Sequence, residues 1–177
     1  MKVRVFIACS SDGFIAGPND ELDWLEGPDG AAEDTFTPFF KGIGAMLMGR
    51  RTYDVVSSFE GDWPYGDTPI IVATNRPLQM AKPSVQGYQG TIEELVAKAK
   101  TMSEGGDVYV DGDNLIRQAL DAGLVDDITL TLITIVLGDG IPLFNGAKQM
   151  HRLELCSQRA IGGGMVELVY ESAKVSS

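Results

Sequence analysis

Two adjacent arginines stand where an apolar, strand-like run turns into a helical pattern. Residues 45–53 read AMLMGRRTY, so Arg50 and Arg51 fall in the first turn of the expected helix. Cationic side chains are unfavourable there, because the positive end of the helix dipole lies at the N-terminus. A bound phosphate would reverse that cost, since free backbone N–H groups and two guanidinium groups would donate to its oxygens. Gly49 would let the backbone approach the anion and Thr52 adds a hydroxyl, so the segment predicts an anion site.

The alternative for this segment is a pair of solvated arginines bound to nearby carboxylates. Asp54, Glu60 and Asp62 follow within reach of the expected helix. Short motifs produce false matches, so both interpretations stay open on this segment alone.

Other loops could extend the anion site. Thr74, Asn75 and Arg76 follow a predicted strand, and Gly112 lies between another strand and a helix. In open α/β sheets, ligands bind beyond the carboxyl ends of the strands, where such loops converge. A dinucleotide with an extra ribose phosphate would use the three arginines together. Neither GxGxxG nor the Walker A pattern occurs, so a nucleotide would bind in another way.

Acidic residues offer a weaker set of candidates. Asp12, Asp20 and Asp23 invite a metal hypothesis, but their spacing does not fit a calcium loop and the closing glutamate is missing. We interpret them as turn residues and predict no metal. Glu33 and Asp34 open the next expected helix, where the dipole would stabilise carboxylates in any case. A catalytic role for these two residues and a purely structural one are weighted equally.

Composition limits the class of protein. The 177 residues suit one domain spanning 1–177, and 25 acidic against 14 basic side chains give a net charge of −11. That charge argues against a nucleic-acid or membrane partner, because binding a polyanion needs a basic face. Cys9 and Cys156 form no CxxC pair, and no apolar run is long enough to cross a membrane. We therefore expect a cytoplasmic protein acting on a small molecule, with His151 at the surface.

Hydrophobic periodicity predicts an α/β fold. Nearly continuous apolar runs indicate strands covered on both faces, and helical patterns separate them. Strands are expected at 3–9, 45–48, 68–73, 85–88 and 108–110, and helices at 31–41, 52–59, 91–102 and 114–122. A long β-branched run at 128–137 and a hairpin of 153–161 with 165–170 follow. The order predicts an open, mostly parallel sheet with antiparallel strands at one edge.

Four motifs in this order carry a family resemblance. They read SSDGFIAGPNDELDW, MGRRTYD, VYVDGDNLI and GLVDDITLTLITIVLGDGIPLF, and together they span nearly the whole chain. The sequence resembles the dihydrofolate reductase-like superfamily, within it the group similar to the reductase domain of the bifunctional riboflavin-biosynthesis protein. The resemblance implies a three-layer α/β/α sandwich, NADPH as cofactor and a homodimer.

The resemblance also implies roles for individual residues. By motif, the NADPH phosphates would be held by Gly49, Arg50, Arg51 and Thr52, the adenosine 2′-phosphate would lie near Thr74, Asn75 and Arg76, and the diphosphate would be supported at Asp111, Gly112 and Asp113. The Ala8 backbone would meet the nicotinamide carboxamide, and the loop from Asp12 through Trp24 would close over the nicotinamide and substrate. Asp12, Trp24, Glu33 and Asp34 are the catalytic candidates.

One departure from the family pattern is Asp113, because relatives carry a second glycine after Gly112. Its carboxylate could repel a diphosphate, or it could be the N-cap of the next helix. The leading hypothesis is an NADPH-dependent reductase that transfers hydride to a small heterocycle, pteridine-like or ribosylaminopyrimidine-like. The alternative is a non-catalytic NADPH- or nucleotide-binding module on the same fold.

Overall fold

The computed structural model describes residues 1–26 and 32–173. The strands are β1 (Val3–Ser10), β2 (Phe14–Ala16), β3 (Ile43–Gly49), β4 (Ile70–Ala73), β5 (Val85–Tyr88), β6 (Asp107–Asp111), β7 (Asp127–Ile133), β8 (Ile141–Pro142), β9 (Leu153–Gly162) and β10 (Met165–Ser172). The helices are η1 (Asp23–Leu25, a 3₁₀ turn), α1 (Phe36–Phe40), α2 (Arg50–Ser57), α3 (Ile92–Met102) and α4 (Asp113–Asp121).

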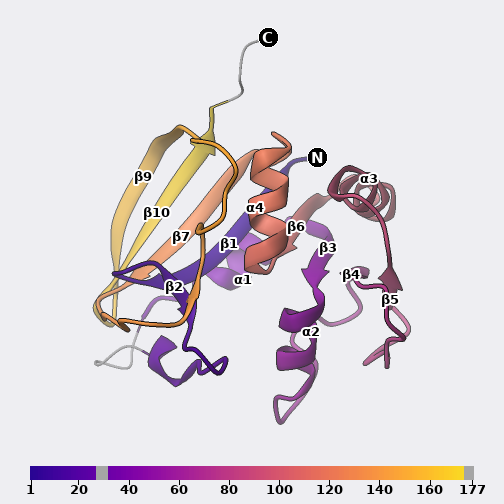
Figure 1. Cartoon of the computed structure of the whole chain (residues 1–177), viewed down its shortest axis with the longest axis horizontal. Coiled ribbons are helices and arrows are strands. Elements are labelled where there is room, and N and C mark those ends of the chain that lie inside the picture. Colours follow the sequence, from indigo (N-terminus) through magenta and orange to yellow (C-terminus); the bar gives the residue numbers. More distant parts are fainter. Residues whose placement is uncertain (27–31, 174–177) are drawn as a thin grey trace.

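Eight of these strands form one sheet in the order β5-β4-β3-β6-β1-β7-β10-β9 (Figure 1). The six strands from β5 to β7 pair in parallel. β1 lies between β6 and β7, which explains its continuous apolar sequence, because a parallel strand in mid-sheet is covered on both faces. The predicted mostly parallel sheet is confirmed.

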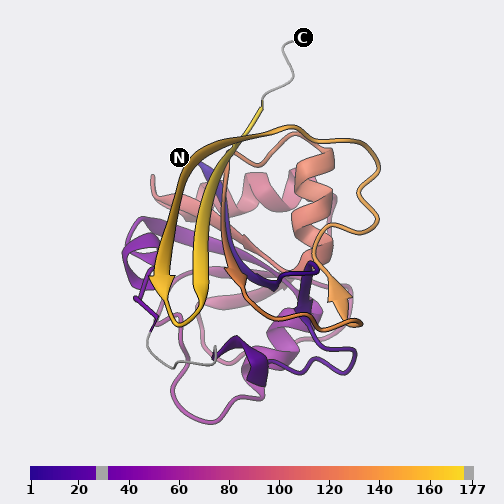
Figure 2. The ribbon, with the colours of Figure 1, turned by 90° about the vertical axis from the view of Figure 1, so that its left-hand side faces the viewer.

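Antiparallel strands complete one edge of the sheet. β10 pairs with β7 and with β9, and the β9–β10 hairpin lies in front in Figure 2. β7 is shorter than the predicted strand over 128–137, since it ends at Ile133. The pairing with both neighbouring strands ends at the same level. Ile133 is the last residue of β7 that pairs with β1, at Ser10, and with β10, at Met165.

Helices cover both faces, which confirms the α/β/α sandwich. On one face, α3 and α4 pack on the sheet through a cluster that includes Leu95, Ile116 and Leu47. On the other, α1 and α2 contribute Phe39 and Tyr53 to a second buried cluster. Several sheet residues of this second cluster lie at the strand ends nearest α2. This face of the sheet therefore also forms the floor of the cavity described below.

Local signals placed two helices correctly. α3, expected over 91–102, begins with a capping box, in which Thr91 and Glu94 exchange side-chain and backbone hydrogen bonds. α4 ends in a Schellman motif, since the N–H groups of Gly123 and Leu124 donate to Leu120 and Ala119 carbonyls. α2 starts at Arg50, so both arginines do lie in its first turn.

Other expectations were wrong. α1 is only five residues long, although a helix over 31–41 was expected; residue 31 and the predicted turn at 27–30 lie outside the described residues. The ribbon of β2 with β8 was not predicted. Cys156 is exposed on the edge strand β9, whereas Cys9 of β1 is buried. Across residues 1–26 and 32–173, no helix has the length and apolarity needed to cross a membrane.

Candidate active site

The helices α2 and α4 begin side by side. Their N-caps are Gly49, the last residue of β3, and Gly112, which follows β6, and these two strands are neighbours in the sheet. Gly112 has φ +105°, and a Cβ there would lie 2.9 Å from Thr52 Oγ1 and 3.4 Å from the Gly49 nitrogen. Neither helix has a side-chain cap, so first-turn N–H groups of both remain available to one ligand. Gly49, Thr52 and Gly112 are therefore brought together as predicted.

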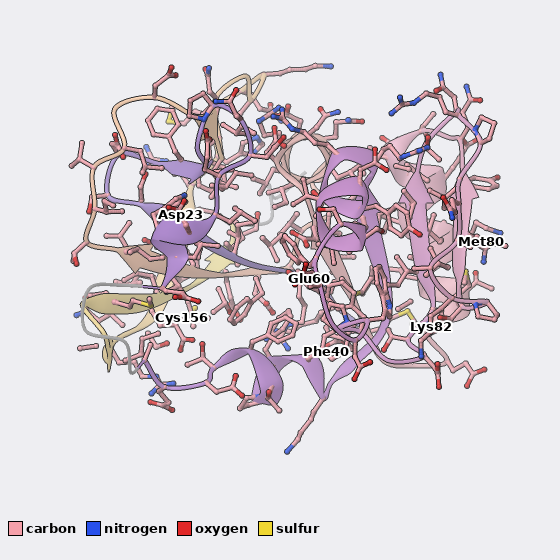
Figure 3. All side chains as sticks on the ribbon, turned by 90° about the horizontal axis from the view of Figure 1, so that it is seen from below. Asp23, Phe40, Glu60, Met80, Lys82 and Cys156 are labelled. Atoms are coloured by element: carbon pink, nitrogen blue, oxygen red, sulfur yellow. The ribbon has the colours of Figure 1, made fainter. Side chains whose placement is uncertain are left out.

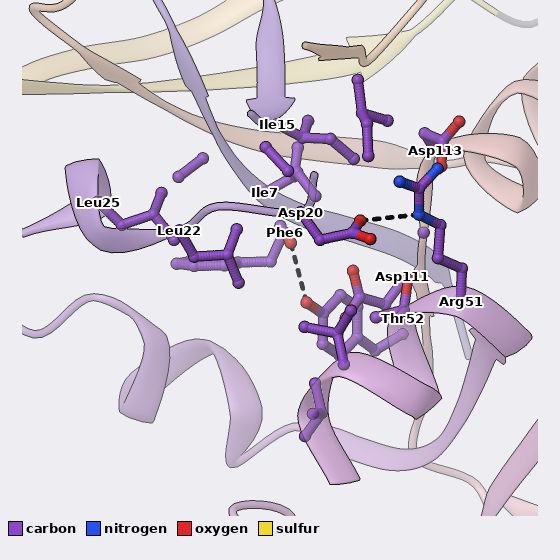
Figure 4. A pocket seen from close by; sticks show the side chains of 17 residues that line it. Phe6, Ile7, Ile15, Asp20, Leu22, Leu25, Arg51, Thr52, Asp111 and Asp113 are labelled. Carbon is purple, nitrogen blue, oxygen red and sulfur yellow. Dashed lines mark hydrogen bonds and ion pairs between the residues drawn. The ribbon is translucent and has the colours of Figure 1, made fainter. Parts of the chain in front are cut away.

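A cavity of about 270 Å³ opens beside these helix ends (Figure 4). Most of its wall is apolar, with side chains from β1, β2, η1, α2 and β8. These are Phe6, Ile7, Ala8, Ile15, Ala16, Leu22, Leu25, Val55, Val56 and Ile141. The polar end is made of Asp20, Arg51, Thr52, Asp111, Gly112 and Asp113, with Tyr109 on the floor. Figure 3 shows the molecule from below, with Asp23 of η1 toward the left and α2 toward the right. An apolar slot with charge at one end suits a flat heterocycle joined to a phosphate group.

The two arginines point to different places. Arg51 lines the cavity, and its Nε donates to Asp20 Oδ1 at 2.7 Å. Arg50 is held outside the cavity: its Nε donates to Asp54 Oδ1 at 2.8 Å, and its Nη1 donates to Thr74 Oγ1 and the Pro77 carbonyl, both at 3.1 Å. The structure thus does not bring the two guanidinium groups together, and Arg50 forms the alternative pair with Asp54.

Thr74, Asn75 and Arg76 line a separate cavity of about 540 Å³ at the ends of β4 and β5. Tyr88 lies in the same wall, and Lys98 Nζ is 4.9 Å from its ring centroid. Arg76 forms no ion pair with any described residue, so its guanidinium can receive an anion. Arg50, in the first turn of α2, donates to Thr74 in the wall of this second cavity. The two cavities therefore lie at the ends of neighbouring strands.

Asp111 is the buried carboxyl of the site. It is the last residue of β6, lines the first cavity and is 9% exposed. Burial raises the pKa of Asp111 to about 6, although a hydrogen bond from the Gly112 N–H acts in the opposite direction. The nearby Tyr109 hydroxyl donates to the Phe6 carbonyl at 2.9 Å. Asp111 can therefore hold a proton up to about pH 6, well above the range of an ordinary aspartate, which suits a general acid. Sequence reasoning placed Asp111 at the cofactor but missed this property.

Asp113 is the first residue of α4, not its N-cap, which is Gly112. Its Oδ2 accepts from Arg117 Nη1 at 2.8 Å, one turn along the same helix. The negative charge that could repel a diphosphate is thus paired within α4. The aspartate at position 113, in place of the family's second glycine, therefore opposes the binding of a diphosphate less than the sequence suggested.

The four catalytic candidates lie outside the cavity wall. Asp12 fixes two loops together: its carboxylate accepts from the Ser10 hydroxyl at 2.6 Å and from the Leu137 and Gly138 N–H groups at 3.1 and 2.7 Å. These bonds, the one from Ser10 above all, lower the pKa of Asp12 to about 2. The Trp24 indole N–H donates to the Glu21 carbonyl at 2.9 Å, inside its own loop. Neither residue is placed to act on a ligand in the cavity.

Glu33 and Asp34 are likewise hydrogen-bonded to other parts of the chain. Glu33 Oε2 accepts from Arg159 Nη1 of β9 at 2.7 Å. Asp34 Oδ1 accepts from the Thr37 N–H at 3.0 Å, near the start of α1, and hydrogen bonds from Thr37 lower its pKa. This bond to the backbone at the start of α1 fits the structural alternative for Asp34. Within the described part of the chain, no cluster of three or more His, Cys, Asp or Glu side chains is placed to bind a metal.

Comparisons with known proteins agree with this fold. Residues 1–167 match the model of the RibD C-terminal domain family. The uncharacterized protein YyaP of Bacillus subtilis (strain 168) is 31% identical over 187 aligned positions, which cover 96% of this chain and 94% of YyaP. A candidate riboflavin biosynthesis protein of Shewanella sp. PV-4 superposes with a TM-score of 0.87 at 29% identity, over 98% and 99% of the two chains. Enterococcus faecalis dihydrofolate reductase, solved with NADP(H), shares the fold alone, with a TM-score of 0.67 at 16% identity over 97% of this chain and 96% of the reductase.

Proposed function

Because the chain belongs to the RibD C-terminal domain family, we propose that it is an NADPH-dependent reductase of a small heterocycle, pteridine-like or ribosylaminopyrimidine-like. Family and fold are those of reductases. The observation that carries the proposal is the pair of uncapped helix starts at Gly49 and Gly112, set at the charged end of an apolar slot.

The residues present fit a dinucleotide. The first-turn N–H groups of α2 and α4 and the Arg51 guanidinium would hold the diphosphate, since a glycine at 112 keeps the space open that a Cβ would fill. Arg76, in the second cavity, would bind the 2′-phosphate. The apolar wall around Phe6, Ile15 and Ile141 would exclude water from the nicotinamide and substrate rings.

In the reaction, the cofactor supplies the hydride and the chain supplies orientation and a proton. Reduction of a carbon–nitrogen double bond adds hydride to carbon and a proton to nitrogen. Asp111 lies in the cavity wall with a raised pKa, so we assign its carboxyl oxygen the transfer of that proton, which requires the substrate nitrogen to reach the polar end of the cavity beside the diphosphate.

The second candidate function is a nucleotide-binding module without turnover. It is favoured by the position of Asp12, Trp24, Glu33 and Asp34 outside the cavity. Tight binding of NADPH without its consumption across pteridine, pyrimidine and quinone panels would support this second function and contradict the first.

Calorimetric titration with NADPH and NADH, on protein stripped of nucleotide, tests the binding site. We expect NADPH to bind more tightly. Arg76→Ala should abolish that preference and leave NADH affinity unchanged, whereas Arg51→Gln should weaken both cofactors because both carry the diphosphate. Lys82→Ala, an exposed cation near the same edge paired with Asp67, is the charge-matched control. Failure of the wild-type protein to bind either cofactor would contradict the proposed function.

A further inference from the structure

The guanidinium at the charged end of the cavity is already occupied by an anion from the chain itself. Arg51 Nε donates to Asp20 Oδ1 at 2.7 Å, and both side chains line the cavity (Figure 4). Arg51 is 57% and Asp20 34% exposed, so the pair is in contact with water. An ion pair of this kind contributes little free energy, because solvent screens it. A ligand with more charge can therefore replace the Asp20 carboxylate.

Asp20 belongs to a loop, residues 17–26, that is bonded mainly to itself. Its N–H donates to the Gly17 carbonyl at 3.1 Å, and the Gly17 N–H donates to the Glu21 carbonyl at 2.9 Å. The Glu21 carboxylate accepts from both nitrogens of Asn19, and the Trp24 indole binds the Glu21 carbonyl. Asp20 has φ +65°, a conformation that aspartate and asparagine tolerate better than most residues. The turn is thus a preformed unit that presents one carboxylate.

Within residues 1–26 and 32–173, Arg51 is the one external hydrogen-bond partner of this loop. Among the described residues, no other hydrogen bond or ion pair joins residues 17–26 to the rest of the chain. The other attachment is apolar, through Leu22 and Leu25 in the cavity wall. Loss of the Asp20 contact would leave the loop without a polar anchor.

We propose that Asp20 is an internal competitor for the phosphate at Arg51, so that an anion bound at the starts of α2 and α4 displaces it and frees loop 17–26. A phosphate oxygen can bind Arg51 and the helix N–H groups together, whereas Asp20 uses the arginine alone. Binding of the anion and release of the loop are then coupled, because the anion replaces Asp20 at Arg51. The inference rests on the phosphate site of the proposed function and is independent of hydride transfer.

Inorganic pyrophosphate is the probe, because it carries the phosphates without a nicotinamide that could contact the loop. Calorimetry on the wild-type protein and on Asp20→Asn gives the affinities. Asparagine keeps the shape and tolerates the backbone conformation, so we expect Asp20→Asn to bind about fivefold more tightly, the scale of one exposed ion pair. Asp23→Asn removes the same charge from an exposed residue of the same loop that does not line the cavity, and it should keep the wild-type affinity.

Hydrogen exchange of peptides covering 17–26 gives the second readout. Pyrophosphate should speed exchange in this loop and slow it at the starts of α2 and α4, the opposite of a general ligand stabilisation. In Asp20→Asn the loop should exchange fast before any addition and respond no further. Equal affinity of Asp20→Asn and wild type, or an equal gain in Asp23→Asn, would overturn the inference while leaving the phosphate site standing. Absence of pyrophosphate binding in all three proteins would overturn the site and the inference together.

Discussion

Asp111 is the residue at which burial and charge oppose each other most directly. Its pKa is about 6 in the folded chain and ordinarily 3.8, so between these values the folded state binds more protons than the unfolded state. Its contribution to stability is therefore complete below the unfolded value and is lost as the pH rises through about 6. At higher pH the buried carboxylate costs about 3 kcal/mol, at 1.36 kcal/mol per unit of pKa.

Asp111→Asn should accordingly stabilise the protein in a pH-dependent way. We expect its free energy of unfolding to exceed that of wild type by about 1–3 kcal/mol near pH 8 and to approach it near pH 4, as measured by urea titration. Asp62→Asn, at an exposed position, is the control and should show no such dependence. The same difference at both pH values would mean that Asp111 is not a buried acid.

Residue types alone predicted the Arg50–Arg51 site only in part, and helix geometry explains why. Successive residues of an α-helix point about 100° apart, so adjacent side chains do not face one ligand. Arg51 therefore reaches the cavity, and Arg50 reaches the turn at Thr74. The burial of Asp111 had no local signal, because it depends on elements far apart in the sequence that the fold brings together, such as β1 and α2, whose Phe6 and Thr52 line the same cavity.

At the scale of elements, the junction between α2 and α4 depends on the glycine at 112. An alanine there would combine an unfavourable backbone at φ +105° with a Cβ 2.9 Å from Thr52 Oγ1. We expect Gly112→Ala to lower the free energy of unfolding by about 3 kcal/mol, since strained backbone alone costs 1–3 kcal/mol. It should also weaken the binding of pyrophosphate, because the first turns of α2 and α4 must move apart to make room for the Cβ.

Gly123 provides the matched control for that change. It also has a positive φ, +67°, but a Cβ there would meet nothing within 4 Å. Gly123→Ala should thus cost about 1 kcal/mol, from the backbone alone, and leave pyrophosphate binding intact. Denaturant titration and calorimetry on both variants separate the two effects. Equal losses in the two variants would contradict a tight junction at Gly112.

Elements with a local cause were predictable, and those with a tertiary cause were not. The capping box at Thr91 and the glycine at 123 specify the ends of α3 and α4 within a few residues. The end of β7 is set by its partners Ser10 and Met165, far away in the sequence. The β2–β8 ribbon likewise joins segments more than a hundred residues apart, so the chain around Phe14 reads as a loop on its own.

At the scale of the whole molecule, the excess of carboxylates matters more than any single pair. The net charge of −11 makes the folded state repel itself, and salt screens that repulsion. Exposed pairs such as Lys82–Asp67 weaken in salt too, but each contributes little. Between about 20 mM and about 300 mM NaCl at neutral pH, we expect Tm to rise by about 3 °C, which corresponds to about 1 kcal/mol in a chain of this length.

Calorimetric scans at both salt concentrations measure that rise, and acid supplies the control. When enough carboxylates are protonated to bring the net charge near zero, the same salt step should leave Tm unchanged, because no net repulsion remains to be screened. A fall of Tm with salt at neutral pH would mean that attractive pairs outweigh the overall charge. The same field acts on an incoming phosphate ligand, so Arg51 and Arg76 are local exceptions on a surface that otherwise repels the anions they are placed to bind.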